Sequence, residues 1–537
     1  MSTQIAYGES PLSELSFLSY WPRVREFAVP ASVIETATAR RMAGDWAGAC
    51  AAAGFDVDLQ LRSVARDHGR DIAGQLRDDL RNLAPDLLRW HMPRIAPDGL
   101  LRPGLTLTLA TYGGGVRERR RPLHLVVRTP PAWADAGQRI SLALWDGGRG
   151  GPAGAGGAGG TGFGGGVGVG GGACSYPHPR PNRRFRLDLH RHLWDARRAG
   201  ELRIRAGGPA RADPDLPGDV PYGRRCAVDR WADEARILLA AEGRSGGAVL
   251  VRLGGRHRLV LDVPAEDRGG PDGAAAALRM AVSGSGRASG LGGRASGGNR
   301  ASGGNRASGG NRASGGNRAS GGNRASVGGR SSALPVLPDA ATWVLPDLEL
   351  LHAGLIDAER LHPLVASALV PEHAASPWPS PRLSPGRTTG QPRLVECRGA
   401  RHRIGLVDGV LVPLDHDPAE IRREELLAAL TGTPLPCLQA IDEAHRRPGC
   451  LPDVRERLDH GDFAGALAVV EGLLGPDAVL RDGALREELE EAARRRIAYG
   501  LFRAGLAGPG PGPGGLRYDE RGRPRDHRAH PRHATFP

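Results

Sequence analysis

Three polar residues at alternate positions, Asp188, His190 and His192, form the clearest chemical pattern in the sequence. If this segment is a β-strand, alternate side chains share one face, so a carboxylate and two imidazoles would converge there. Such a donor set suits a divalent transition metal. The spacing identifies no fourth ligand, and the alternative is the solvent face of a half-buried strand. The pattern predicts a metal site and, as one possible function, a metal-dependent hydrolase.

A second acid and base group consists of Asp415, His416 and Asp417. It falls where a predicted sheet meets a predicted helix, so its side chains are an alternative acid/base or metal site. Asp417 also has a structural role open to it, because Asp followed by Pro is a strong helix start.

Two short Arg-His-Arg motifs stand at predicted hairpin turns. Their residues are Arg256, His257, Arg258, Arg401, His402 and Arg403. Turn amides and guanidinium groups together would cradle an anion. The alternative is a pair of solvated turns in a duplicated structural unit.

The cysteines are widely spaced and contain no Cys-x-x-Cys pair. They are Cys50, Cys174, Cys226, Cys397, Cys437 and Cys450. Neither a disulfide framework nor a zinc knuckle is predicted, and reduced, mostly buried thiols are expected. Cys437 and Cys450 flank His445, so a Cys-His nucleophile is the alternative to structural thiols. No cofactor is predicted apart from a divalent metal at an Asp/His cluster.

All 72 basic residues counted in the 537-residue chain are arginine, and no lysine is present. This excludes a Walker-type phosphate loop, a kinase strand lysine, a Schiff-base enzyme and a Ser-x-x-Lys acylase, because guanidinium cannot replace their amine. Arginine without lysine, together with 80 Gly and 43 Pro, is typical of a GC-rich genome.

The net charge of +13 is concentrated in two low-complexity segments. Between Arg287 and Arg330 lie eight arginines and no acidic residue, and the tail from Arg517 is also basic. The first segment contains a repeat of Arg-Ala-Ser-Gly-Gly-Asn, which has no large apolar side chain to bury and predicts a flexible linker. Polyanion binding through this linker and the tail is the alternative, and nucleic acid is not the favoured partner.

Periodicity predicts helices first and strands after them. Helices are expected over 31–43, 46–53, 59–83 and 86–92, and strands over 105–109, 123–128, 139–145 and 185–193. A helix over 231–241 leads into a hairpin of 248–253 and 257–263.

The C-terminal part follows the repeat with helical pieces over 348–369. A three-stranded meander is expected over 394–397, 403–407 and 410–414. A helix capped by Asp417 should end at Gly432, and the rest of the chain through Leu506 is expected to be helical.

These elements predict an α+β protein with a helical N-terminal part, small antiparallel sheets and a helical C-terminal part. The expected divisions are 1–98 helical, 99–265 mostly β with a disordered Gly-rich loop at 147–175, 266–338 a disordered repeat linker, 339–506 α+β and 507–537 a disordered basic tail.

A Gly-Asp-aromatic-Ala-Gly-Ala motif begins at Gly44 and again at Gly461, each time between two predicted helices. It resembles the turn and second helix of a tetratricopeptide hairpin over roughly two dozen residues, without an array of repeats. Paired helices of this kind favour a non-enzymatic protein-interaction or scaffold role with a protein partner. The N-terminus lacks a secretory signal and no membrane segment is expected, so the predicted location is cytoplasmic.

Overall fold

The predicted fold class, α+β with helical terminal parts and small antiparallel sheets, is confirmed. The computed structural model describes residues 18–113, 121–147, 176, 178–206, 224–254, 257–265, 277–280, 334–373, 393–446, 448–475 and 479–506. Nearly all of the predicted Gly-rich loop, most of the predicted repeat linker and the whole predicted basic tail lie outside the described residues.

A run of helices leads into the central sheet. Its members are α2 (Trp21–Arg23), the π-helical turn η1 (Val24–Ala28), α3 (Ala31–Met42), α4 (Trp46–Ala52), α5 (Leu61–Asp67), α6 (Arg70–Asn82) and α7 (Pro85–Trp90). Asp45 caps α4 by accepting a hydrogen bond from Gly48 N at 2.8 Å. The helical region predicted over 59–83 is divided at Gly69, whose φ of +102° ends one helix and begins the next.

The central sheet has the strand order β1-β6-β5-β4. Its strands are β1 (Phe55–Asp58), β4 (Thr106–Tyr112), β5 (Leu123–Arg128) and β6 (Ile140–Trp145). A separate two-stranded ribbon of β2 (Arg94–Ile95) and β3 (Leu100–Leu101) precedes β4 in the chain. The three later strands were predicted and pair antiparallel. β1 was not predicted, and it pairs parallel with β6, with Phe55 opposite Ile140.

The segment predicted as a strand over 185–193 instead forms turns and the 3-10 helix η4 (Arg191–Leu193), followed by η5 (Ala199–Glu201) and α8 (Leu202–Arg205). Side chains bond back to the main chain here. His190 Nδ1 donates to the carbonyl oxygen of Arg186 at 3.0 Å, and Trp194 Nε1 donates to that of Leu187 at 2.9 Å. Such bonds compete with strand pairing and explain why the alternating pattern does not produce a strand.

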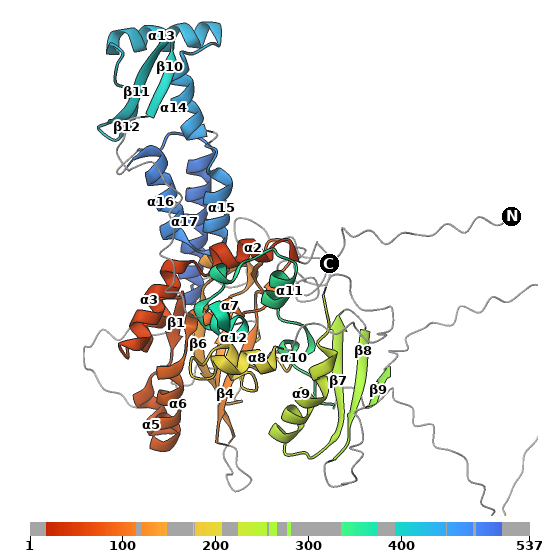
Figure 1. Ribbon diagram of the computed structural model, residues 1–537. Coiled ribbons are helices and arrows are strands. Elements are labelled where there is room, and N and C mark those ends of the chain that lie inside the picture. The colour runs from red at the N-terminus through yellow and green to blue at the C-terminus, as the bar shows by residue number, and fades with distance from the viewer. Residues whose placement is uncertain are drawn as a thin grey trace, which may run out of the picture.

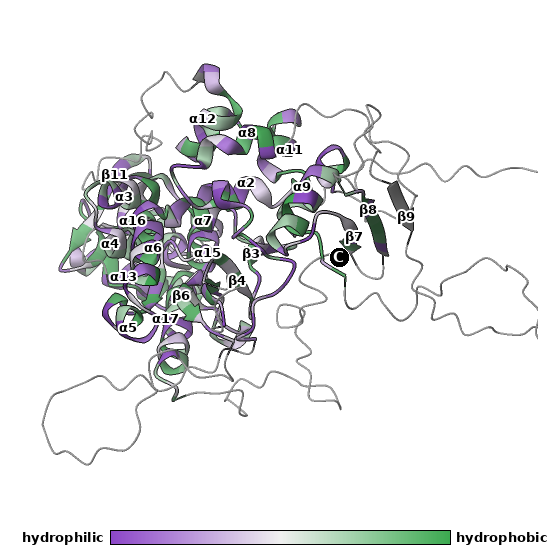
Figure 2. Cartoon of the chain, turned by 90° about the horizontal axis from the view of Figure 1, so that it is seen from below, coloured by the Kyte–Doolittle hydropathy of each residue, from purple (hydrophilic) through white to green (hydrophobic). Residues whose placement is uncertain are grey.

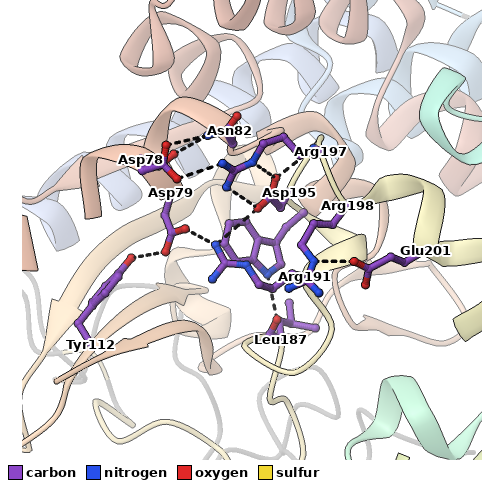
Figure 3. A network of polar contacts seen from close by, with 11 residues as sticks. Asp78, Asp79, Asn82, Tyr112, Leu187, Arg191, Asp195, Arg197, Arg198 and Glu201 are labelled. Atoms are coloured by element: carbon purple, nitrogen blue, oxygen red, sulfur yellow. Dashed lines mark hydrogen bonds and ion pairs between the residues drawn. The ribbon is translucent and has the colours of Figure 1, made fainter. Parts of the chain in front are cut away.

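A polar network fastens this segment to α6 and β4 (Figure 3). Arg191 forms ion pairs with Asp79 and Asp195, and the Tyr112 hydroxyl donates to Asp79 at 2.7 Å. Asp195 is fully buried and also pairs with Arg197 at 3.2 Å. Because a buried carboxylate must be matched by charge and hydrogen bonds, this network fixes the path of the segment over the sheet.

A second sheet packs against α9 (Val228–Ala241). It consists of β7 (Gly247–Gly254), β8 (His257–Val263) and β9 (Ala277–Met280), and its first two strands form the predicted hairpin. Trp231 of α9 is buried and donates from Nε1 to the carbonyl oxygen of Thr342 at 3.0 Å, which connects α9 to α10 (Asp339–Thr342). Figure 2 shows this sheet at one side of the molecule.

The main hydrophobic core crosses the divisions expected at residues 98 and 339. The relevant later elements are α11 (Pro346–His352), η7 (Ala358–Arg360), α12 (Pro363–Leu369) and η8 (Pro371–His373). Leu350, Leu361 and Val365 belong to the same buried cluster as Leu80 of α6 and Leu107 of β4. Residues on both sides of the repeat therefore build one core.

A buried ion pair reinforces this connection. Arg25 donates to Asp347 at 2.8 Å, and the two side chains are 2% and 0% exposed. The Arg25 guanidinium lies over the rings of Trp21 and Trp90, 4.7 and 4.3 Å from their centroids, and Trp90 Nε1 donates to Asp347 at 3.1 Å. Both charges are thus desolvated and paired with each other, and the Arg25 Nε has no hydrogen-bond partner.

The C-terminal part begins with the predicted antiparallel meander and continues with helices. Its elements are β10 (Arg393–Cys397), β11 (Ala400–Val407), β12 (Val410–Pro413), α13 (Pro418–Thr431), α14 (Pro436–Arg446), α15 (Leu451–His460), α16 (Phe463–Leu474) and α17 (Ala484–Arg503). Asp417 caps α13 by accepting from Ala419 N at 2.9 Å, and Gly432, with φ +74°, ends it; both features were predicted.

The repeated Gly-Asp motif has the same local structure at both sites. Asp462 caps α16 by accepting from Gly465 N at 2.9 Å, as Asp45 caps α4 from Gly48. A Cβ on Gly48 or Gly465 would lie 2.1 or 2.0 Å from the capping carboxylate, so a larger residue there would displace the cap. The motif therefore specifies a tight turn between two packed helices.

The sheet β1-β6-β5-β4 and the helices α2–α7 form the central body of the molecule. The C-terminal helices pack against this body, and β10–β12 and α13 lie at the far end (Figure 1). The lower end of α17 (Ala484–Arg503) contacts β1, where Tyr499 donates to Asp56 and Arg503 pairs with Asp58. Arg89 of α7 donates to the carbonyl oxygen of His460 at 3.1 Å. The unpredicted strand β1 thus forms part of the surface on which the C-terminal helices dock.

His460 makes this junction sensitive to acid. Its ring is buried, neither ring nitrogen has a hydrogen-bond partner, and burial, with Arg94 and Arg89 nearby, lowers the pKa to about 3. An unfolded histidine titrates at about pH 6.5, so between these two pKa values the unfolded chain binds a proton that the folded chain does not. Stability therefore falls as the pH falls through this window, by up to about 1.4 kcal/mol per pH unit.

We expect a His460→Gln variant to show a flatter dependence of unfolding free energy on pH between about 4 and 6, as measured by urea denaturation. His352→Gln, at an exposed position of α11, should keep the original slope. If the unfolding free energy of the His460 variant kept the same dependence on pH, His460 would not be the group responsible for it.

Within the described ranges, no helix is both long enough and apolar enough to cross a membrane.

Candidate functional site

A cavity of about 160 Å³ lies where the central body meets α8, α9 and residues 338–346. Its wall combines guanidinium groups with aromatic rings. The aromatic residues are Tyr20, Trp21, Trp90, Phe185 and Trp343. A pocket between packed elements, with apolar walls and converging polar groups, is the usual form of a ligand site.

Eight arginines line this cavity, and Asp339 is the acidic residue among the lining side chains. The arginines are Arg25, Arg94, Arg102, Arg184, Arg186, Arg205, Arg224 and Arg230. Ion pairs between described residues engage Arg25 with Asp347, Arg184 with Asp339, Arg186 with Asp188 and Arg205 with Glu234.

Arg94, on β2, is buried without an ion pair to any described carboxylate. It is 8% exposed, and its terminal nitrogens donate to the carbonyl oxygens of Gly99 at 3.3 Å and Arg89 at 3.0 Å. Its Nε has no hydrogen-bond partner. Buried charges in proteins are normally paired, so Arg94 is the group for which an anion in the cavity would be the missing partner.

Burial and the close approach of several arginines lower the pKa values of guanidinium groups in the wall. Burial, and then the positive charges of Arg89 and Arg25, lower the pKa of Arg94 well below its usual range. Burial and Arg184 lower the pKa of Arg102 to about 10. An anionic ligand would oppose both shifts, because it favours the charged form of each guanidinium.

Aromatic rings orient several of these guanidinium groups. Arg224 lies over the ring of Trp343, 4.5 Å from its centroid, and Arg184 lies over Phe185 at 5.5 Å. Stacking on a ring face holds a planar guanidinium in one orientation. The donors of the wall are thus preorganised by packing.

Two histidines of the wall are neutral at physiological pH. Burial, followed by the charges of neighbouring groups, lowers the pKa of both His91 and His192 well below the usual value. His91 Nε2 and His192 Nδ1 have no hydrogen-bond partner. These imidazoles supply neutral polar atoms beside the charged groups.

The predicted metal ligands Asp188, His190 and His192 lie near the cavity, but each of them makes different contacts. Asp188 is paired with Arg186 at 2.7 Å, and His190 Nε2 lies 3.2 Å from Glu234 Oε2. His192 lines the cavity. Among the residues that the structure describes, these three do not form a set of converging ligand atoms.

The two predicted Arg-His-Arg turns do not contribute to the cavity wall. Arg256 and the side chain of His257 lie outside the described residues, and the neighbouring Arg258 is half-buried. Arg401 is exposed, whereas Arg403 is held by Asp415 at 2.6 Å.

The predicted group of Asp415, His416 and Asp417 is also divided among separate contacts. Hydrogen bonds from Arg403 lower the pKa of Asp415 to about 2. Asp417 caps α13. His416 is turned inward and stacks on His402, with ring centroids 4.1 Å apart.

No cavity arginine was among the site residues predicted from the sequence. Their positions extend from 25 to 230, and arginine is the basic residue throughout the chain, so neither spacing nor composition distinguishes them. Comparison of the chain with protein-family models, curated protein sequences and solved structures gave no match. The interpretation of the cavity therefore rests on its own chemistry.

Proposed function

We propose that the protein binds a small, multiply charged anion in the arginine-lined cavity. The observation that carries this proposal is Arg94, a buried guanidinium with no carboxylate partner among the described residues, in a wall of eight arginines. A bound anion would supply the counter-charge and could accept a hydrogen bond from the unpartnered Nε of Arg94.

The size and lining of the cavity limit the ligand. A volume of about 160 Å³ is close to that of an apolar cavity which holds a benzene-sized molecule. Guanidinium groups match phosphate and carboxylate oxygens, and the aromatic wall accommodates a short carbon skeleton. A phosphate ester or a small di- or tricarboxylate has this chemistry.

Titration of the full-length protein with inorganic phosphate, pyrophosphate and citrate tests the proposal. At least one of them should raise the unfolding temperature and give a saturable calorimetric signal, with stabilisation of about 2.7 kcal/mol at 100 times the dissociation constant. Sodium chloride at matched ionic strength serves as the control for screening. If none of the three acts beyond chloride, the proposal fails.

The protein-interaction role predicted from the sequence stays a prediction, and one observation favours it. Helix α13 has no buried residue and exposes Leu426, Leu427 and Leu430. A leucine-rich face at the far end of the molecule suits a partner surface (Figure 1). Copurification of a defined partner should depend on these leucines; a partner retained by a Leu426→Asp, Leu430→Asp variant would count against this surface.

The predicted metal-dependent hydrolase likewise stays a prediction. Polyanion binding through the repeat linker and tail concerns segments that are largely outside the described residues.

A further inference from the structure

Two cysteines and a histidine from three separate elements meet at the far end of the molecule. Cys397 is the last residue of β10, His416 precedes α13, and Cys437 lies at the start of α14. Their ligand atoms, two thiol sulfurs and an imidazole nitrogen, all lie within 4.8 Å of one another. This set was not predicted from the sequence, because its members are 19 and 21 positions apart and form no Cys-x-x-Cys pair.

The three side chains have little exposure to solvent. Cys397 and Cys437 are 0% exposed, and neither is in a disulfide. The His416 side chain is 4% exposed, and its Nε2 has no hydrogen-bond partner. A buried imidazole nitrogen without a partner, next to two thiols, is the donor arrangement of a metal site rather than of an apolar core.

We propose that Cys397, His416 and Cys437 bind a zinc ion. Two thiolates and an imidazole suit zinc, which takes tetrahedral sulfur and nitrogen ligands and is selected by soft thiolates over magnesium or calcium. The fourth position is open to water or to a further side chain. His402 is the adjacent imidazole, stacked on His416, and its Nδ1 is also buried without a hydrogen-bond partner.

The carboxylate of Glu420 lies next to the His416 ring. Glu420 Oε2 of α13 lies 3.6 Å from His416 Nδ1. In zinc sites the nitrogen that does not bind metal commonly donates to such a carboxylate, which fixes the ring orientation and the tautomer. This contact leaves Nε2 as the atom that faces the metal.

The surrounding subdomain, β10–β12 with α13 and α14, has little apolar core of its own. One buried cluster consists of Cys397, Leu435 and Cys437, the other of Ile404, Ala440 and Ile441, and α13 buries no residue. Units with so few buried side chains usually depend on a disulfide or a metal for their stability. The zinc ion would join the end of β10, the start of α13 and the start of α14.

Metal analysis of the full-length protein, purified with a thiol reductant and without chelator, tests the proposal. We expect one zinc ion per chain in the unaltered protein and its loss in Cys397→Ser and Cys437→Ser variants. Cys450→Ser is the matched control, because this cysteine lies at the start of α15 outside the cluster, and it should retain the zinc.

Cobalt replacement gives a readout that does not depend on the variants folding. Cobalt added to the metal-free, reduced protein should produce thiolate charge-transfer absorption and the intense visible bands of a tetrahedral site, and zinc should displace it. After chelation, hydrogen exchange should accelerate in residues 393–446 and stay unchanged in the central strands β4–β6.

Three results would overturn the proposal. One is an unaltered protein that neither contains zinc nor gives thiolate–cobalt absorption. Another is zinc that persists in a Cys397→Ser, Cys437→Ser double variant, which would identify an adventitious ion. The third is a disulfide between Cys397 and Cys437 that persists under the reductant.

Discussion

An Arg94→Met variant is expected to lose most of the anion-dependent stabilisation while remaining folded. Methionine keeps the apolar stem of the side chain but removes the charge and the Nε donor that has no partner. A hydrogen bond to a charged group contributes about 1.5–3 kcal/mol, so affinity for the tightest of the three test anions should fall roughly 10- to 150-fold. At an anion concentration that stabilises the unaltered protein by about 2.7 kcal/mol, the variant should gain only about 0.3–1.4 kcal/mol.

The ligand-free Arg94→Met protein should unfold at the same temperature as the unaltered protein or higher. Removing a buried charge without an ion pair relieves its desolvation cost, which offsets the loss of the two bonds to the carbonyl oxygens of Gly99 and Arg89. This separates loss of binding from loss of structure. Arg77→Gln, at an exposed position of α6, is the matched control and should bind normally. Unchanged anion stabilisation in the Arg94 variant would refute the proposed site.

An Asp347→Asn variant is expected to destabilise the protein by about 3–5 kcal/mol, since it removes the charge that compensates Arg25. Arg25 remains enclosed between Trp21 and Trp90, where water cannot replace the carboxylate. The midpoint of urea denaturation, followed by tryptophan fluorescence and by circular dichroism, measures the effect.

An exposed ion pair provides the comparison for Asp347. Asp482 pairs with Arg486 at 2.7 Å on α17, but its side chain is 96% exposed, so Asp482→Asn should change stability by no more than about 1 kcal/mol. If Asp347→Asn also lowered the unfolding free energy by less than about 1 kcal/mol, the Arg25–Asp347 pair would not be the link between the two parts of the core.

Local signals predicted much of the fold. The start and end of α13 follow from Asp417 and Gly432, whose effects act within one helical turn. The turn between β11 and β12 follows from Asp408 and Gly409, both of which have positive φ, as a two-residue hairpin turn requires.

The unpredicted features depend on contacts between distant residues. β1 is four residues long, and its partner Ile140 lies on a strand far along the chain, so its sequence carries little pattern of its own. Arg94 is of a residue type that is usually exposed, and it is buried only because separate elements enclose it. Cys397 and Cys437 meet through a hairpin and two helix ends, a convergence that spacing alone does not encode.

The pairing of Arg25 with Asp347 also sets an order of events during synthesis. The two residues are 322 positions apart, so at a translation rate of about 5–20 residues per second the carboxylate leaves the ribosome roughly 16–64 s after its guanidinium. Until then Trp21, Trp90 and the leucines that α11 and α12 cover lack their final partners. The growing chain therefore exposes apolar surface for far longer than a local fold would, and chaperones that bind such surface have that interval in which to act.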